Sequence, residues 1–130
     1  MKQQRIAHIT LLVENYDEAI DFYTQKLGFI LRQDVKLSKT KRWVIIAPKN
    51  EMGSALLLAQ ADGDLQVNAI GNQAGDRVFL FLHTDDFSRD YGEMREKGVI
   101  FTESPRNEPY GTVVVFKDLY GNLWDLIEPK

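Results

Sequence analysis

The chain has 130 residues, the size of one ordinary globular domain. Apolar residues make up 44% and charged residues 27%, which is typical of globular rather than disordered proteins. The net charge of −3 argues against nucleic acid as a partner, and the absence of cysteine excludes disulfides, thiolate metal sites and cysteine nucleophiles. Apolar runs of about five residues fall far short of the roughly 20 needed to span a bilayer, so we expect no membrane partner and a cytoplasmic location.

The first half of the chain predicts a strand, a helix and three further strands. Branched and aliphatic residues from Arg5 to Val13 indicate the first strand. Apolar residues at helical spacing follow, and Gly28 ends the predicted helix because glycine readily adopts the left-handed conformation. The remaining strands are predicted at 29–37, 42–47 and 54–60.

The second half repeats this order after a glycine-bearing polar stretch, residues 61–76, which we interpret as a linker or flap. A strand is predicted at 77–84, and a helix with Phe87, Tyr91 and Met94 on one face ends at Gly98. The last strands are predicted at 99–103, 111–117 and 122–128.

The two halves therefore have the same β-α-β-β-β order, in modules of about 1–60 and 77–130 joined by the linker. Chance similarity is the alternative, but the matched helix starts, helix-ending glycines and closing turns favour an internal repeat. We predict one α+β domain, residues 1–130, in which the two modules pair into a curved, barrel-like mixed sheet that encloses a cleft.

Three strings carry a resemblance to a known family: His8–Val13, Ala19–Tyr23 followed by Leu27–Phe29, and Phe116–Leu126. They resemble the two halves of the vicinal oxygen chelate superfamily, which contains glyoxalase I, bleomycin- and fosfomycin-resistance proteins and extradiol dioxygenases. The resemblance implies paired modules and a small-molecule site in the cleft. It does not choose a reaction, because this fold hosts isomerases, transferases, oxygenases and non-catalytic binders.

The resemblance also implies positions for a divalent metal on the first and last strands of each module. His8 matches the first histidine ligand and Asp125 the last carboxylate, whereas Phe79 and Leu57 occupy the other two positions. Aligning the two halves likewise places Phe79 opposite His8 and Leu57 opposite Asp125. Two protein ligands are fewer than the three or four of well-held metals, so we expect a degenerate site and no tight metal.

His8 and Asp125 are also the candidate catalytic residues, with the aspartate orienting the imidazole as a general base or hydrogen-bond donor. A buried, purely structural His–Asp pair is the alternative. A third alternative is that these two residues bind a divalent metal, in a site that lacks its other protein ligands.

Several residues are candidates for binding a flat, partly apolar ligand. Thr10 shares a strand face with His8, and the aromatic candidates are Trp43, Phe79, Phe81 and Phe116. The alternative for these aromatic residues is the core. Trp124 points away from Asp125, so we expect it to pack under a helix.

The loop 104–111, bounded by prolines and a glycine, adds two candidates. Arg106 is expected to meet an anionic group on a ligand, and Tyr110 to cover it. A solvated turn with no binding role is the alternative.

The function that these patterns favour is the binding of a small, partly apolar molecule in a cleft with a degenerate metal site. A metal-dependent lyase, isomerase or dioxygenase is one alternative, and a non-catalytic structural or partner-binding module is another. The resemblance also allows a homodimer, since members often complete their clefts across a two-fold axis.

Overall fold

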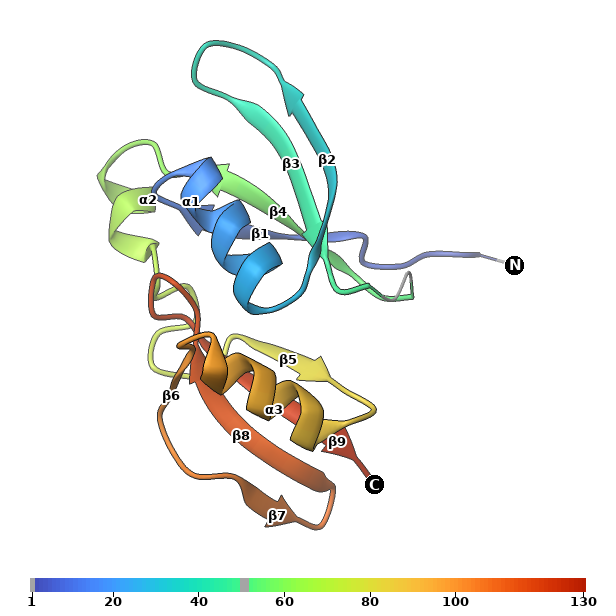
Figure 1. Ribbon diagram of the computed structural model, residues 1–130. Coiled ribbons are helices and arrows are strands. Elements are labelled where there is room, and N and C mark those ends of the chain that lie inside the picture. Colours follow the sequence, from blue (N-terminus) through green and yellow to red (C-terminus); the bar gives the residue numbers. More distant parts are fainter. Residues whose placement is uncertain (1, 50–51) are drawn as a thin grey trace. The chain divides into compact units, whose positions relative to one another are not determined.

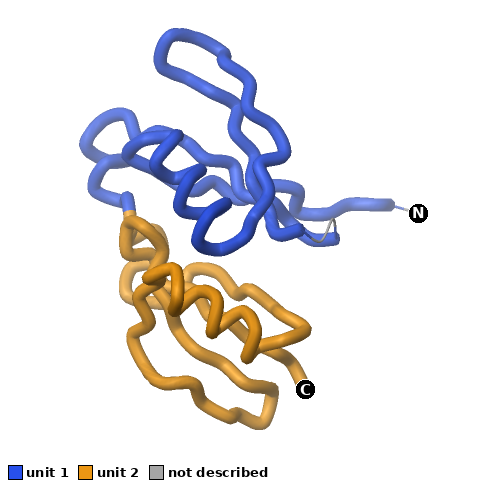
Figure 2. The backbone as a smooth tube through the Cα atoms, in the orientation of Figure 1, with its two compact units in different colours: residues 1–70 blue, residues 71–130 orange. Residues whose placement is uncertain are grey.

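The computed structural model describes residues 2–49 and 52–130 and contains two compact units, residues 1–70 and 71–130 (Figure 2). Each unit is described by itself below. Both contain a mixed sheet and a helix, so the α+β class predicted from the sequence is confirmed. Within the described residues, no helix has the length and apolar character that a membrane crossing requires.

The first unit is a four-stranded sheet with the order β1-β4-β3-β2 (Figure 1). Its first strand runs parallel to its last, and the other pairs are antiparallel. The elements are β1 (His8–Val13), α1 (Tyr16–Asp21), the π-helical segment η1 (Phe22–Lys26), β2 (Ile30–Lys36), β3 (Arg42–Ala47), β4 (Ala55–Gln60) and α2 (Asp64–Ala69).

The helix α1 covers one face of this sheet. Arg42 of β3 reaches α1, since its backbone N–H donates to the Tyr16 hydroxyl and its guanidinium donates to Asp17. Because side chains alternate along a strand, the residues that share the face of Arg42 form the core beneath the helix. They are buried: Leu11, Val13, Val44, Ile46, Leu56 and Leu58. The opposite face carries His8 and Trp43.

The second unit repeats the arrangement, again with its first and last strands parallel. Its sheet has the order β5-β9-β8-β6, with β7 also paired to β8. The elements are β5 (Leu80–His83), α3 (Phe87–Glu96), β6 (Ile100–Phe101), β7 (Arg106–Glu108), β8 (Gly111–Lys117) and β9 (Leu123–Pro129).

A chain of aromatic rings fills the space between α3 and this sheet. Tyr91 of the helix contacts Phe101, Phe101 contacts Phe116, and Phe116 stacks on Trp124 with ring centroids 5.8 Å apart. Phe116 is fully buried, and Trp124 is 3% exposed. Trp124 therefore packs under the helix, as the sequence predicted.

The structure contains two elements that the sequence-based expectations lacked. The stretch 61–76 contains the helix α2 rather than only a linker, and its exposed apolar side chains explain why no amphipathic pattern signalled it. Arg106–Glu108 forms the strand β7 within the expected loop. Both helix-ending glycines behave as predicted, with φ of 74° at Gly28 and 85° at Gly98.

Candidate functional site

Trp43 is the most informative side chain on the face of the first sheet opposite to α1. It is 36% exposed, although a large aromatic ring gains free energy from burial. Its indole N–H donates to the Gln33 side-chain carbonyl over 2.6 Å, and the His8 ring meets it edge-on at 5.9 Å between centroids. The indole is thus both accessible and held in a fixed orientation.

An apolar floor lies beside Trp43 on the same face. Ile45, Ala47 and Ala55 are buried there, with Leu57 packed against them. Thr10 lies in register with Leu57, so its side chain shares this face, and it is exposed. The face therefore combines a fixed aromatic ring, an apolar floor and the polar side chains of His8 and Thr10.

In the second unit, Asp125 lies on the sheet face opposite to the aromatic core. It is 8% exposed, and its Oδ1 has no hydrogen-bond partner among the described residues. Burial raises the pKa of this carboxyl, and the negative charge of Glu103 adds to the effect while Arg106 opposes it. A buried carboxylate oxygen without a donor is a costly feature.

The aromatic candidates of this unit separate onto two faces. Phe81 pairs with Asp125 in the β5–β9 register and is 61% exposed, so it remains a candidate. Phe79, which precedes β5 and bonds through its N–H to the Leu123 carbonyl, is half-buried. Phe116, by contrast, points into the core beneath α3, because its neighbour Val115 is the residue in register with Asp125. Phe116 thus lies in the core, which is the alternative that the sequence left open for the aromatic residues.

Arg106 differs from the free cation expected in the 104–111 loop. Its Nε donates to Glu103 at 2.7 Å and its Nη1 to Glu108 at 3.0 Å. Hydrogen bonds with Glu103, Tyr110 and Glu108 raise the pKa of Arg106 further above its usual value. Two carboxylates thus already satisfy this guanidinium, which weakens the expectation that it meets an anionic ligand. Tyr110 itself is exposed in the β7–β8 turn.

Neither unit by itself supplies a metal centre. In residues 2–49 and 52–130, no group of three or more His, Cys, Asp or Glu side chains is placed to hold an ion. His8 shares its face with Thr10 and Leu57, and Asp125 lies between Phe81 and Val115 in the register. Each unit by itself offers one candidate ligand, whereas stable metal sites use three or four.

Gln33 is a site residue that the sequence analysis missed. Its contact with Trp43 depends on the pairing of β2 with β3, whose register shifts between Leu31 and Gln33. Such a bulge changes which side chains of a strand share a face. The signal available in the sequence was limited to two adjacent strand-forming segments, and that does not fix a register.

The arrangement of two β-α-β-β-β units agrees with the comparison to known protein families. The chain belongs to the glyoxalase/bleomycin resistance protein/dioxygenase superfamily, whose family model matches residues 5–126. An uncharacterized protein of Shewanella frigidimarina (strain NCIMB 400) is 54% identical over 127 residues, which cover 97% of this chain and 94% of that protein.

Two solved structures are similar over almost the whole chain. UcmS2 is 30% identical with a TM-score of 0.83, and the match covers 98% of this chain and 99% of that one. TnmS3, an antibiotic binding protein from Streptomyces sp. CB03234, is 29% identical with a TM-score of 0.81, covering 100% of this chain and 99% of that one. These comparisons establish the family and the fold. The reaction or ligand has to be inferred from the residues of the candidate site.

Proposed function

We propose that the protein binds a small, flat, partly apolar molecule, with Trp43 as the surface on which that molecule stacks. The observation that carries this proposal is an exposed indole fixed by Gln33 and His8 above an apolar floor. A ring that is already oriented loses little conformational freedom on binding, so more of the stacking and burial energy becomes affinity.

The polar neighbours limit the ligand to one that is only partly apolar. His8 and Thr10 lie on the same face as the apolar floor, and a purely hydrocarbon ligand would remove their polar atoms from water without replacing those hydrogen bonds. An aromatic molecule with one or two polar substituents matches this surface. On the second unit, the exposed ring of Phe81 beside Asp125 offers a further surface of the same kind.

The structural relative TnmS3 supports binding rather than catalysis as the starting hypothesis, because it is an antibiotic binding protein of the same fold and nearly full-length similarity. We propose a ligand of the size and character of a small aromatic antibiotic. A metal-dependent activity is not favoured, because the donor set of each unit falls short of a metal centre.

Binding of a neutral tricyclic probe, acridine at pH 7.5, tests the role of Trp43 by calorimetry. Trp43→Ala removes the stacking surface and is expected to weaken binding about 30-fold or more, as central aromatic contacts do. Gln33→Leu keeps the Trp43 ring but removes the acceptor of its indole N–H, and we expect acridine affinity to fall about three- to tenfold. Leu65→Ala, which removes an exposed apolar side chain on α2, is the control and should leave binding unchanged.

A second set of measurements decides between binding and metal chemistry. Native mass spectrometry of the purified protein would show a co-purified ligand. Titration with Ni²⁺, Mn²⁺, Fe²⁺ and Zn²⁺ would overturn the proposal if it gave stoichiometric binding at micromolar concentration or tighter that is lost in His8→Ala and Asp125→Ala. Acridine binding of equal strength in Trp43→Ala and the unmodified protein would contradict the stacking surface directly.

The cytoplasmic location and the homodimer expected from the sequence are likewise retained as proposals. Light scattering coupled to size-exclusion chromatography would test the dimer through the molar mass, since one chain accounts for 15.0 kDa.

A further inference from the structure

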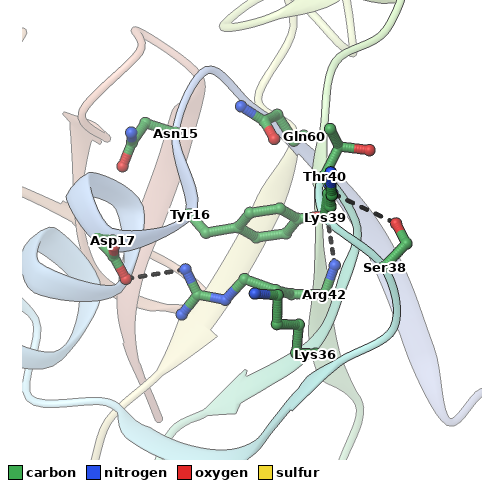
Figure 3. A pocket seen from close by; sticks show the side chains of 9 residues that line it. All are labelled: Asn15, Tyr16, Asp17, Lys36, Ser38, Lys39, Thr40, Arg42 and Gln60. Atoms are coloured by element: carbon green, nitrogen blue, oxygen red, sulfur yellow. Dashed lines mark hydrogen bonds and ion pairs between the residues drawn. The ribbon is translucent and has the colours of Figure 1, made fainter.

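A pocket of about 370 Å³ lies at the edge of the first unit, where α1 begins beside the β2–β3 turn (Figure 3). All of its lining residues belong to residues 15–60. It is separate from the Trp43 surface, because Arg42 lines the pocket and adjacent residues of β3 point to opposite faces of the sheet.

The lining of this pocket is positively charged. Lys36, Lys39 and Arg42 contribute three positive charges, and Asp17 contributes one negative charge. Lys36 pairs with Arg42 in the β2–β3 register, so the two cations share one face of the sheet. Figure 3 shows their side chains side by side, with Lys39 at the turn above them. Asp34, outside the lining, is paired with Arg42, so about one positive charge is left in excess, and such a concave surface attracts an anion.

Arg42 is held in position before any ligand arrives. Asp34 accepts from its Nε at 3.1 Å and from its Nη2 at 2.6 Å, which fixes the plane of the guanidinium. The Tyr16 ring lies 5.1 Å from the guanidinium carbon, which adds a cation–π contact. The remaining contact is Nη1 with Asp17 at 2.9 Å.

Asp17 occupies the position that a ligand oxygen would take. Its side chain is 79% exposed, so its ion pair with Arg42 is screened by water and contributes little to stability. A ligand oxyanion that also contacts the two lysines gains more at Nη1 than Asp17 does alone. The carboxylate can rotate into solvent at low cost because it is already hydrated.

The β2–β3 turn holds the rim of the pocket. The Ser38 hydroxyl accepts from the backbone N–H groups of Thr40 at 3.3 Å and Lys41 at 3.1 Å. This arrangement fixes the turn that carries Lys39 and the Thr40 hydroxyl (Figure 3). The volume lies within the range of small-molecule sites and exceeds what an inorganic ion needs.

From these observations we infer that the pocket binds the phosphate group of a small phosphorylated molecule. A phosphate monoester carries about −1.5 to −2 charges at pH 7 and three acceptor oxygens, which match two lysines and one arginine better than a single carboxylate does. The organic part of the ligand fills the volume that the phosphate leaves.

Calorimetric titrations with phenyl phosphate, inorganic phosphate and benzoate test this inference. Phenyl phosphate is expected to bind more tightly than either of the others. Lys36→Gln and Lys39→Gln are each expected to weaken phenyl phosphate binding about two- to fivefold, because each removes one solvent-accessible ion pair. Lys117→Gln, an exposed lysine of the second unit, is the matched control.

Asp17→Asn gives the sharpest result, since it removes the competing carboxylate and should strengthen phenyl phosphate binding about two- to fivefold. Weaker binding in Asp17→Asn, or equal binding in the two lysine variants and the control, would overturn the inference. Equal affinity for phenyl phosphate and inorganic phosphate would overturn the part of it that concerns an organic ligand. Trp43→Ala should leave phenyl phosphate binding unchanged, which separates this site from the proposed aromatic surface.

Discussion

The two units have the same architecture and opposite distributions of polar and apolar side chains at matching positions. In the first unit, Thr10 of the first strand lies in register with Leu57 of the last. In the second, Phe81 of the first strand lies in register with Asp125 of the last. The polar residue is therefore on the first strand in one unit and on the last strand in the other. The fold tolerates this exchange because the parallel pairing of first and last strands depends on backbone hydrogen bonds.

The comparison also extends to what lies on the two faces of each sheet. The face beneath the helix carries the main apolar core in both units, including Leu11 and Ile46 in the first and Phe116 and Leu126 in the second. The other face carries the residues that differ between the units, including His8, Trp43, Phe81 and Asp125. Stability thus depends mainly on the face beneath the helix, whereas the aromatic ligand that we propose binds on the opposite face. The proposed phosphate pocket lies at the edge of the helix-side face of the first unit. The following predictions test that division, from the largest expected effect to the smallest.

Phe116→Ala should cause the greatest loss of stability. This ring is fully buried and stacked on Trp124, so its removal leaves a cavity that costs about 3–5 kcal/mol of unfolding free energy. Phe81→Ala on the other face of the same sheet should cost less than about 0.5 kcal/mol, because the ring is 61% exposed. Urea denaturation measures both values. Similar losses in the two variants would contradict the division between faces.

Asp118→Ala should rank second, with a loss of about 2–3 kcal/mol. The buried Asp118 carboxylate accepts from the backbone N–H groups of Tyr120, Gly121 and Asn122 and from the Asn122 side chain. This network shapes the turn between β8 and β9, and thermal unfolding followed by circular dichroism reports its loss. Asp118→Asn retains one acceptor and should recover part of the stability.

Asp125→Asn should instead stabilise the protein at neutral pH, by about 1 kcal/mol. The pKa of Asp125 is raised in the folded state, so this state binds the proton more tightly than the unfolded chain does. The unmodified protein therefore loses stability as the pH rises from about 4 through the folded-state pKa. Denaturation curves between pH 3.5 and 7 should show that the free energy of unfolding of Asp125→Asn exceeds that of the unmodified protein at pH 7, and that the two values converge at pH 3.5.

The exposed Asp21 provides the control for this prediction, and Asp21→Asn should show no such pH-dependent gain. If Asp125→Asn changes the free energy of unfolding by the same amount at every pH, burial of the carboxylate charge is not the cause of the change.

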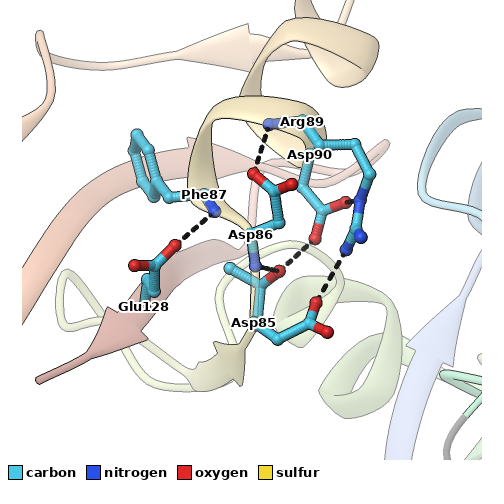
Figure 4. Close-up of polar contacts among 7 residues, drawn as sticks. Asp85, Asp86, Phe87, Arg89, Asp90 and Glu128 are labelled. Carbon is cyan, nitrogen blue, oxygen red and sulfur yellow. Dashed lines mark hydrogen bonds and ion pairs between the residues drawn. The ribbon is translucent and has the colours of Figure 1, made fainter.

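The helix caps should produce the smallest effects, of similar size in both units. Asn15 accepts from Glu18 N–H at 2.9 Å and Asp86 from Arg89 N–H at 3.1 Å, and because both caps are exposed, an alanine at either position should cost about 0.5 kcal/mol. Figure 4 shows that Glu128 also accepts from the Phe87 N–H at the start of α3. Asn15→Ser and Asp86→Ser retain an acceptor and should restore stability in chemical denaturation.

Much of the fold could be predicted because its signals are local. The strands 42–47 and 111–117 have the predicted bounds, and both helix ends coincide with glycines at positive φ. Alternating apolar residues predict these strands, and helical spacing followed by a glycine predicts where each helix ends. The short strand β7 and the helix α2 were missed because neither has an apolar pattern of its own.

The candidate site could be predicted only in part, because strand register and ion pairing are not local. Alternation was enough to place Thr10 with His8 and to separate Trp124 from Asp125. It was not enough to place Phe116, whose face follows from the β8–β9 register, or to show that two glutamates already hold Arg106. The metal positions that the sequence assigned to His8 and Asp125, and the cleft between the modules, stay predictions.

The pairing of the first and last strands within each unit has a consequence for folding during synthesis on the ribosome. The sheet of the first unit contains no strand beyond Gln60, whereas β5 begins only at Leu80. Every strand of the first sheet has therefore been synthesised before the ribosome reaches the first strand of the second. Because α1 forms from neighbouring residues but the β1–β4 ladder must close a loop of some forty residues, we expect that ladder to form late. Vectorial synthesis would then let one sheet close without competition from the similar strands that follow.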